Sequence, residues 1–193
     1  HLNAGKAMAV VTGIGDYYGA VIKEFTILPM YINSMEIHVE KNVTYVGKAC
    51  KPKVKVMYNI SALKENVDYK LTYSNNKKIG YGKVTIQGIG NYTGKITKKF
   101  KILPQKPNLL KKAKIGNGKW KISWRKTAAV DGYELQYCTN SKFKKQVLRK
   151  QISGANKNAV CITVGIGSAK CYVRIRSYKK VNGKKWYSPF DSM

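Results

Sequence analysis

Alternation of hydrophobic and polar positions runs through most of this chain and predicts β-strands. In residues 95–102, Ile96, Phe100 and Ile102 point to one side, while a threonine and lysines occupy the positions between them. A period of two is typical of a half-buried strand, and no stretch shows the 3.6-residue period of a helix. The expected fold class is therefore all-β. Strands are predicted at residues 7–12, 20–28, 35–40, 53–58, 69–74, 83–87, 95–102, 119–124, 132–138, 148–152, 160–164, 171–178 and 185–188.

One sequence phrase occurs twice. Residues 13–29 read GIGDYYGAVIKEFTILP, and residues 88–104 read GIGNYTGKITKKFKILP, so the copies align without a gap at an offset of 75 residues. Self-similarity at a fixed offset indicates repeated modules. Each copy predicts a glycine-rich turn followed by a strand that a proline ends. The glycine spacing differs from that of a dinucleotide-binding loop, which also requires a helix where this chain has a strand.

Residues 1–30 match only the last part of the repeat and predict a β-hairpin with strands at 7–12 and 20–28. An isolated two-stranded hairpin is marginally stable in water. This hairpin is therefore expected to pack against the next module, against a second copy of the chain, or against residues of a longer protein from which this chain is a fragment.

The second copy of the phrase ends a longer pattern. Its parts are YVGKACKP at 45–52, DYKLTY at 68–73, SNN at 74–76 and GIGNYTG at 88–94. Together they resemble the bacterial immunoglobulin-like repeats of large secreted and surface proteins. The resemblance implies an immunoglobulin-like β-sandwich at residues 31–104, with residues 1–30 as the C-terminal part of a truncated repeat. The expected architecture is tandem immunoglobulin-like β-sandwiches preceded by a β-hairpin.

Residues 105–193 follow the strand that ends at Pro104 and use different motifs. These are ISW at 122–124, DGYELQY at 131–137, KF at 142–143, YVRIRSY at 172–178 and NGKKWYS at 182–188. In combination they resemble a bacterial, lysine-rich fibronectin type III domain, which implies a further sandwich with Trp124 in its core. The sequence departs from the family at Cys171, which takes the inward position of the family's corner tyrosine, while Tyr172 faces outward.

Charge is the extreme feature of the composition. The chain has 37 lysines and arginines and nine acidic residues, a formal net charge of +28. Residues 1–104 contribute +10 of this charge and residues 105–193 contribute +18. A positive potential of this size favours anionic partners through steering and counterion release. The alternative is a solvated, lysine-rich surface without a specific partner.

Residues that carry catalytic chemistry are few. The two histidines are His1 and His38, and alternation places His38 toward solvent. The four cysteines form no C-x-x-C pair and are expected to be small, mostly buried thiols. No hydrolase motif or zinc motif is present, and no run of 18 apolar residues could span a membrane. We therefore expect no enzyme activity, no cofactor, no metal site and no membrane span.

Residues suited to an anionic partner concentrate in the last 89 residues. Because strand 171–178 alternates, its two arginines and a tyrosine are expected on the outer face, beside Glu134 and Gln136 of strand 132–138. Further basic and aromatic residues are expected on the next strand and on the final hairpin. The alternative is ordinary cross-strand pairing of Glu134 with an arginine. The candidate anion-binding residues are Arg174, Arg176, Tyr178, Lys144, Lys145, Arg149, Lys150, Lys184, Lys185 and Trp186.

Three classes of function fit this sequence. The leading hypothesis is a non-catalytic spacer or adhesion module of a secreted or cell-surface bacterial protein, whose partner is an anionic cell-wall polymer or glycan, or a host or surface protein. The second is an accessory substrate- or wall-binding region of a larger secreted hydrolase. The third, nucleic-acid binding, is favoured by charge alone, because no RNA-recognition aromatic motif or recognition helix is present. The expected localisation is extracellular or at the cell surface.

Overall fold

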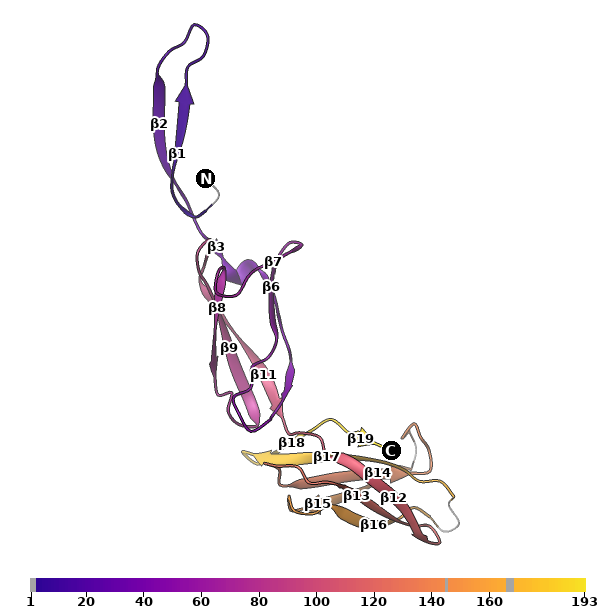
Figure 1. Cartoon of the computed structure of the whole chain (residues 1–193). Helices are drawn as coiled ribbons and strands as arrows, with labels where there is room; N and C mark the ends of the chain where they lie inside the picture. The colour runs from indigo at the N-terminus through magenta and orange to yellow at the C-terminus, as the bar shows by residue number, and fades with distance from the viewer. Residues whose placement is uncertain (1–2, 145, 166–168) are drawn as a thin grey trace. The chain divides into compact units, whose positions relative to one another are not determined.

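The computed structural model describes residues 3–144, 146–165 and 169–193 (Figure 1). These residues form β-strands, turns and a three-residue 3₁₀ helix, η1 (Ile32–Ser34), and no α-helix occurs among them. The all-β prediction is confirmed. The chain divides into two compact units: His1–Lys41, Pro52–Asn75 and Gly82–Phe100 form the first, and Asn42–Lys51, Asn76–Tyr81 and Lys101–Met193 form the second. The predicted boundaries after residues 30 and 104 differ from this division and stay a prediction.

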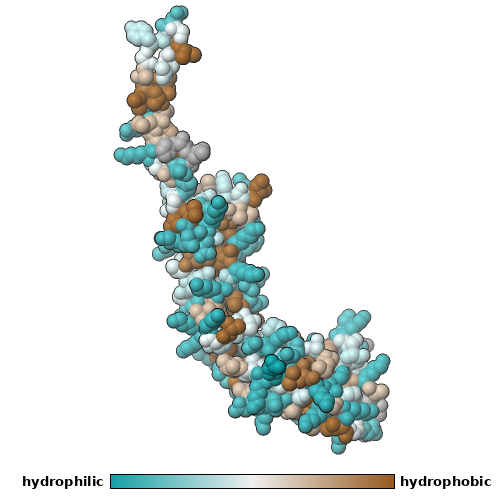
Figure 2. Space-filling view, in the orientation of Figure 1, coloured by the Kyte–Doolittle hydropathy of each residue, from teal (hydrophilic) through white to brown (hydrophobic). Residues whose placement is uncertain are grey.

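The first unit begins with the predicted hairpin. Strands β1 (Gly5–Thr12) and β2 (Ala20–Ile27) pair antiparallel over eight residues, and they form a sheet of two strands. Hydrophobic side chains remain at the surface of this hairpin (Figure 2). Met8, Val10 and Ile22 are 64%, 58% and 60% exposed.

Two larger sheets and a short parallel pair follow the hairpin. One sheet has the order β4-β6-β7 and the other the order β5-β11-β9-β8, and β3 pairs with β10. Val56 of β6 and Val84, Ile86 and Phe100 of the second sheet are at most 1% exposed. The bounds are β3 (Met30–Tyr31), β4 (Glu36–Val39), β5 (Asn42–Thr44), β6 (Val54–Tyr58), β7 (Ser61–Ala62), β8 (Tyr69–Ser74), β9 (Gly80–Gly88), β10 (Tyr92–Thr93) and β11 (Lys95–Leu103).

The larger part of the second unit consists of two sheets. The first has the order β12-β13-β16, and the second has the order β15-β14-β17-β18, with β19 also paired to β17. The bounds are β12 (Asn108–Gly116), β13 (Lys119–Arg125), β14 (Gly132–Cys138), β15 (Leu148–Ser153), β16 (Ala159–Thr163), β17 (Tyr172–Val181), β18 (Lys184–Tyr187) and β19 (Asp191–Ser192).

A single hydrophobic core joins these two sheets. Ile122 and Trp124 of β13 are 0% and 1% exposed and belong to one cluster with Leu135 and Val173 of the opposite sheet. Residues of both sheets therefore meet in one layer, which is the arrangement of a β-sandwich. The prediction that Trp124 is a core residue is confirmed. Cys171 also lies in this cluster, as its alternation with Val173 predicted.

Candidate functional site

The outer face of the β15-β14-β17-β18 sheet carries the predicted arginines. β14 and β17 pair antiparallel, with Gln136 opposite Arg174 and Glu134 opposite Arg176. Ile175, between the two arginines in sequence, is fully buried. Because successive side chains of a strand point to opposite faces, both arginines turn away from the core, as predicted.

Arg176 forms a compensated ion pair. Its Nη2 and Nε atoms lie 2.8 Å and 3.1 Å from Oε1 of Glu134. The guanidinium also stacks on Tyr187, 3.8 Å from the ring centroid, and lies 4.6 Å from the centroid of Phe190. Burial, reinforced by the Glu134 carboxylate, raises the pKa of Tyr187. The charge of Arg176 is therefore neutralised within the sheet, which is the cross-strand pairing that the alternative interpretation predicted.

Arg174 has different partners from its neighbour. Its Nε donates to Oε1 of Gln136 at 2.9 Å, and the Gln136 amide donates to Oε1 of Glu134 at 2.9 Å. The guanidinium lies between two rings, 4.4 Å from the centroid of Phe143 and 4.4 Å from that of Phe190. Among the ion pairs of the described residues, none includes Arg174. Since an amide is neutral, the hydrogen bond to Gln136 does not compensate the positive charge of Arg174.

The end of the chain positions the ring that both arginines share. After β18, the Ser188 N–H donates to the carbonyl of Ser177, and the Ser177 N–H donates to Oγ of Ser188, each at 3.0 Å. The strand is interrupted at Pro189 and resumes as β19, with Ser192 opposite Arg174. Phe190 lies between these two paired stretches. The interruption therefore fixes the Phe190 ring over the arginines.

Asp191 fastens this final strand to the other sheet. Its Oδ2 accepts the N–H of Leu109 in β12 at 2.8 Å, and its Oδ1 accepts Nζ of Lys106 at 2.9 Å. Burial alone would raise the pKa of Asp191, but the hydrogen bonds from Leu109 and Lys106 outweigh it and hold the pKa below its ordinary value. The carboxylate thus remains charged at neutral pH and holds β19 in place.

A cleft of about 500 Å³ opens beside Arg174. It lies where the loop after β14 meets the start of β17 and the final strand. Basic, aromatic and hydroxyl side chains line it, among them Lys142, Phe143, Tyr172, Arg174, Phe190 and Ser192. This composition is suited to a ligand that has both a negative charge and an apolar surface.

Tyr178 lies on the predicted face but is not available to a ligand. It is 2% exposed and stands opposite Gly132. A Cβ atom at Gly132 would lie 2.8 Å from the Tyr178 hydroxyl oxygen, so the glycine leaves room for the ring. We therefore assign Tyr178 a packing role.

The predicted basic residues near β15 do not form one group. Arg149 is paired with Gln136 and shares the face of Arg174, whereas Lys150 is paired with Leu135 and points to the other side. Lys144 is exposed and lies outside the strands, and Lys145 lies outside the described residues.

The final hairpin is divided in the same way. Lys185 is paired with Lys180 and shares the face of Tyr178, and its Nζ donates to Oε1 of Gln151 at 2.7 Å. Lys184 and Trp186 alternate with Lys185 and point to the opposite face. Alternation within one strand thus separates residues that the sequence analysis had grouped.

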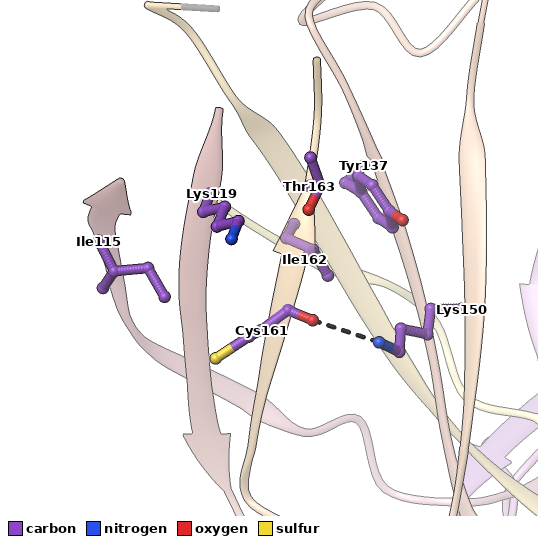
Figure 3. Close-up of a pocket in the computed structure, with 7 residues that line it drawn as sticks. All are labelled: Ile115, Lys119, Tyr137, Lys150, Cys161, Ile162 and Thr163. Carbon is purple, nitrogen blue, oxygen red and sulfur yellow. Dashed lines mark hydrogen bonds between the residues drawn. The ribbon is translucent and has the colours of Figure 1, made fainter. Parts of the chain in front are cut away.

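A second hollow, of about 430 Å³, lies at one end of the β13 and β16 sheet (Figure 3). Lys150 directs its Nζ to the carbonyl oxygen of Cys161 at 3.2 Å, while the Cys161 sulfur points away from the amine. Ile115, Tyr137 and Ile162 supply much of the remaining lining. The thiol and the amine are therefore not brought together as reactive partners.

Two kinds of site are absent from the described part of the chain. Within residues 3–144, 146–165 and 169–193, no three His, Cys, Asp or Glu side chains gather as a metal site. Over the same residues, no helix has the length and hydrophobicity to cross a membrane. The arginine-bearing face remains the strongest candidate for function.

No protein-family model and no curated protein matches this chain. The resemblance to immunoglobulin-like repeats and to a fibronectin type III domain therefore stays a prediction that rests on the motifs.

The aromatic rings that contact the arginines were not predicted from the sequence. Phe143 lies in a loop, and nothing in its local pattern indicates a contact with β17. Phe190 had a signal: the Ser188-Pro189 pair interrupts a strand, and pairing that resumes after such an interruption places the next residue beside Arg176. The role of Tyr187 follows from its place opposite Tyr178 on β18.

Proposed function

We propose that this chain is a non-catalytic spacer or adhesion region of a secreted or cell-surface bacterial protein, and that its last 89 residues bind an anionic polymer or glycan. In this proposal residues 31–104 form an immunoglobulin-like repeat and residues 105–193 a fibronectin type III domain. A host or surface protein with an acidic surface would be bound through the same face.

The observation that carries the proposal is the state of Arg174. Its guanidinium is half-buried between two aromatic rings, has a neutral amide as its polar partner, and lies in a region of net charge +18. A desolvated cation interacts more strongly with an anion than a fully hydrated one does. The region also attracts polyanions at long range, because its field is positive on average.

The test is the binding of the whole chain to a polyanion as salt is raised. Affinity for polygalacturonate, measured by isothermal titration calorimetry, should fall at least about tenfold between about 50 mM and about 200 mM NaCl. The double variant Arg174→Ala, Arg176→Ala should weaken binding more than the matched double variant Lys77→Ala, Lys78→Ala, which removes two exposed charges of the preceding sequence. An affinity that does not change with salt would contradict the proposal.

Two alternatives use the same surface. An accessory region of a larger secreted hydrolase would bind the polymer in the same way and would differ in having a catalytic neighbour. Single-stranded DNA at the same salt concentrations separates the third class, because nucleic-acid binding predicts that DNA competes effectively with polygalacturonate.

A further inference from the structure

The cleft beside Arg174 has the size and composition of a small-ligand site. Its volume of about 500 Å³ lies within the range of about 300–1,000 Å³ that ligand pockets commonly have. Lys142 and Arg174 supply positive charge, and Phe143, Tyr172 and Phe190 supply aromatic surface. Among the described residues that line the cleft, none is acidic.

One wall of the cleft is held in an uncommon backbone conformation. Phe143 has a φ of 51°, in the left-handed region that bulky residues rarely adopt. Asn140 fixes this loop: its carbonyl accepts the N–H of Phe143 at 3.1 Å, and its Oδ1 accepts the N–H of Lys142 at 2.8 Å. Such strain persists where surrounding contacts impose it and is frequent at ligand sites. Here it places the Phe143 ring against Arg174.

The guanidinium of Arg174 has donors left for a ligand. In the described part of the chain its one hydrogen bond runs from Nε to Gln136. The two Nη groups form the planar fork that matches a carboxylate. Arg176 cannot serve in the same way, because Nη2 and Nε are already bonded to Glu134.

We propose that this cleft binds one hexuronic acid unit of an anionic polysaccharide, with the carboxylate on the Nη fork of Arg174. The inference rests on the proposed function and names the ligand class of the same site. The apolar face of the sugar ring packs on the aromatic walls, Lys142 adds a second positive charge, and the Ser192 hydroxyl is available to a ring hydroxyl. A phosphodiester chain without rings would leave the three aromatic side chains uncovered.

The first experiment compares two ligands on the unmodified chain. Trigalacturonic acid should bind, and its methyl ester, which keeps the rings and removes the charges, should bind at least about tenfold more weakly. The chain has four arginines, Arg125, Arg149, Arg174 and Arg176, so their Nε resonances can be followed separately by NMR. Titration of trigalacturonic acid should shift the Arg174 resonance most.

The second experiment uses matched variants. Arg174→Met keeps much of the packing and removes the charge, and Arg174→Lys keeps the charge and removes the planar fork. Both should weaken trigalacturonate binding by about 10- to 100-fold, the range expected for a charged hydrogen bond. The control Arg125→Met removes an exposed arginine from β13, in the opposite sheet, and should change the affinity less than about twofold. Thermal unfolding of each variant shows whether it is folded.

The outcomes separate this inference from the proposed function. Equal losses from Arg174→Met and Arg125→Met, with salt-dependent binding of polygalacturonate retained, would overturn the cleft and leave diffuse anion binding intact. No salt-dependent binding of any polyanion would overturn both. Tighter binding of single-stranded DNA than of trigalacturonate, with the largest shift again at Arg174, would assign the cleft to nucleotides instead. The ligand comparison on the unmodified chain decides the matter even if the Arg174 variants do not fold.

Discussion

Two hairpins in this protein share a sequence phrase and differ in burial. The turn of β1–β2 closes with the Gly13 N–H donating to the Gly19 carbonyl at 3.0 Å, and that of β9–β11 closes with Gly88 and Gly94 in the same way at 3.0 Å. Yet Phe25 is 50% exposed, while Phe100, 75 residues later, is 1% exposed. The two hairpins therefore share the turn and its closing hydrogen bond, whereas only the hairpin that faces a second sheet buries its phenylalanine.

The outer faces of the two hairpins also differ. Met8, Val10 and Ile22 stand where β9 and β11 carry Lys83, Thr85 and Thr97. The two threonine hydroxyls are hydrogen-bonded at 2.8 Å, as on a solvated sheet face. Residues 1–29 contain two lysines and two acidic residues, so this hairpin is formally neutral within a chain of net charge +28. The outer face of β1–β2 is therefore apolar, whereas the corresponding face of β9–β11 is polar.

The largest expected difference between the hairpins concerns their phenylalanines. Phe100→Ala should lower the free energy of unfolding by about 3–5 kcal/mol, because it empties a filled core. Phe25→Ala should change it by less than about 0.5 kcal/mol, since the ring is half exposed. Guanidinium-induced unfolding followed by tyrosine fluorescence measures both. Similar losses from the two variants would show that β1–β2 is packed in solution as β9–β11 is.

The turn glycines give a smaller effect. A Cβ atom at Gly88 would lie 2.7 Å from the Thr93 nitrogen, and one at Gly13 would lie 2.7 Å from the Tyr17 carbonyl carbon. Gly88→Ala should therefore destabilise its surroundings by about 1–3 kcal/mol. Gly13→Ala should remove amide hydrogen-exchange protection from β1 and β2 and leave β9 and β11 unchanged. Loss of protection in both hairpins from Gly13→Ala would contradict their independence.

Substitutions on the outer faces of the two hairpins should have the smallest effect on stability. The triple variant Met8→Lys, Val10→Thr, Ile22→Thr should shift the free energy of unfolding by less than about 0.5 kcal/mol, because all three side chains are exposed. It should nevertheless reduce binding of a hydrophobic dye. The reverse triple variant, Lys83→Met, Thr85→Val, Thr97→Ile, serves as the control and should increase dye binding. Unchanged dye fluorescence in both variants would show that these faces are not accessible patches.

Period-two reasoning predicted the strands that are regular. It placed Cys171 in the core and turned Arg174 and Arg176 outward, because the pleat alone determines these directions. The core position of Trp124 was expected from the resemblance to a fibronectin type III domain. It missed β12, whose register shifts at two places, between Leu109 and Lys111 and between Lys114 and Gly116. Each shift breaks the alternation, so the lysines of this strand follow no simple pattern.

The candidate site was also predicted only in part, because some of its residues lie outside regular strands. The neighbours of the arginines on β14 follow from strand pairing, and the sequence analysis identified Glu134 and Gln136. Which arginine pairs with the Glu134 carboxylate depends on the register of β14 against β17. The aromatic rings that cover the arginines come from segments outside the regular strands. Phe143 is positioned by the hydrogen bonds of Asn140, and Phe190 by those between Ser188 and Ser177, and these contacts are made only in the folded chain.

The carboxylate of Asp191 has a mechanical consequence. It joins β19 of one sheet to Leu109 of the other, so a pull that peels the final strand from β17 must also break a charged hydrogen bond across the sandwich. This hydrogen bond therefore resists a pulling force at the place where β19 would begin to separate from β17. This hydrogen bond would weaken only in strong acid, once the carboxyl is protonated below its lowered pKa, and the segment before β19 that carries Phe190 would then be less firmly held over the two arginines.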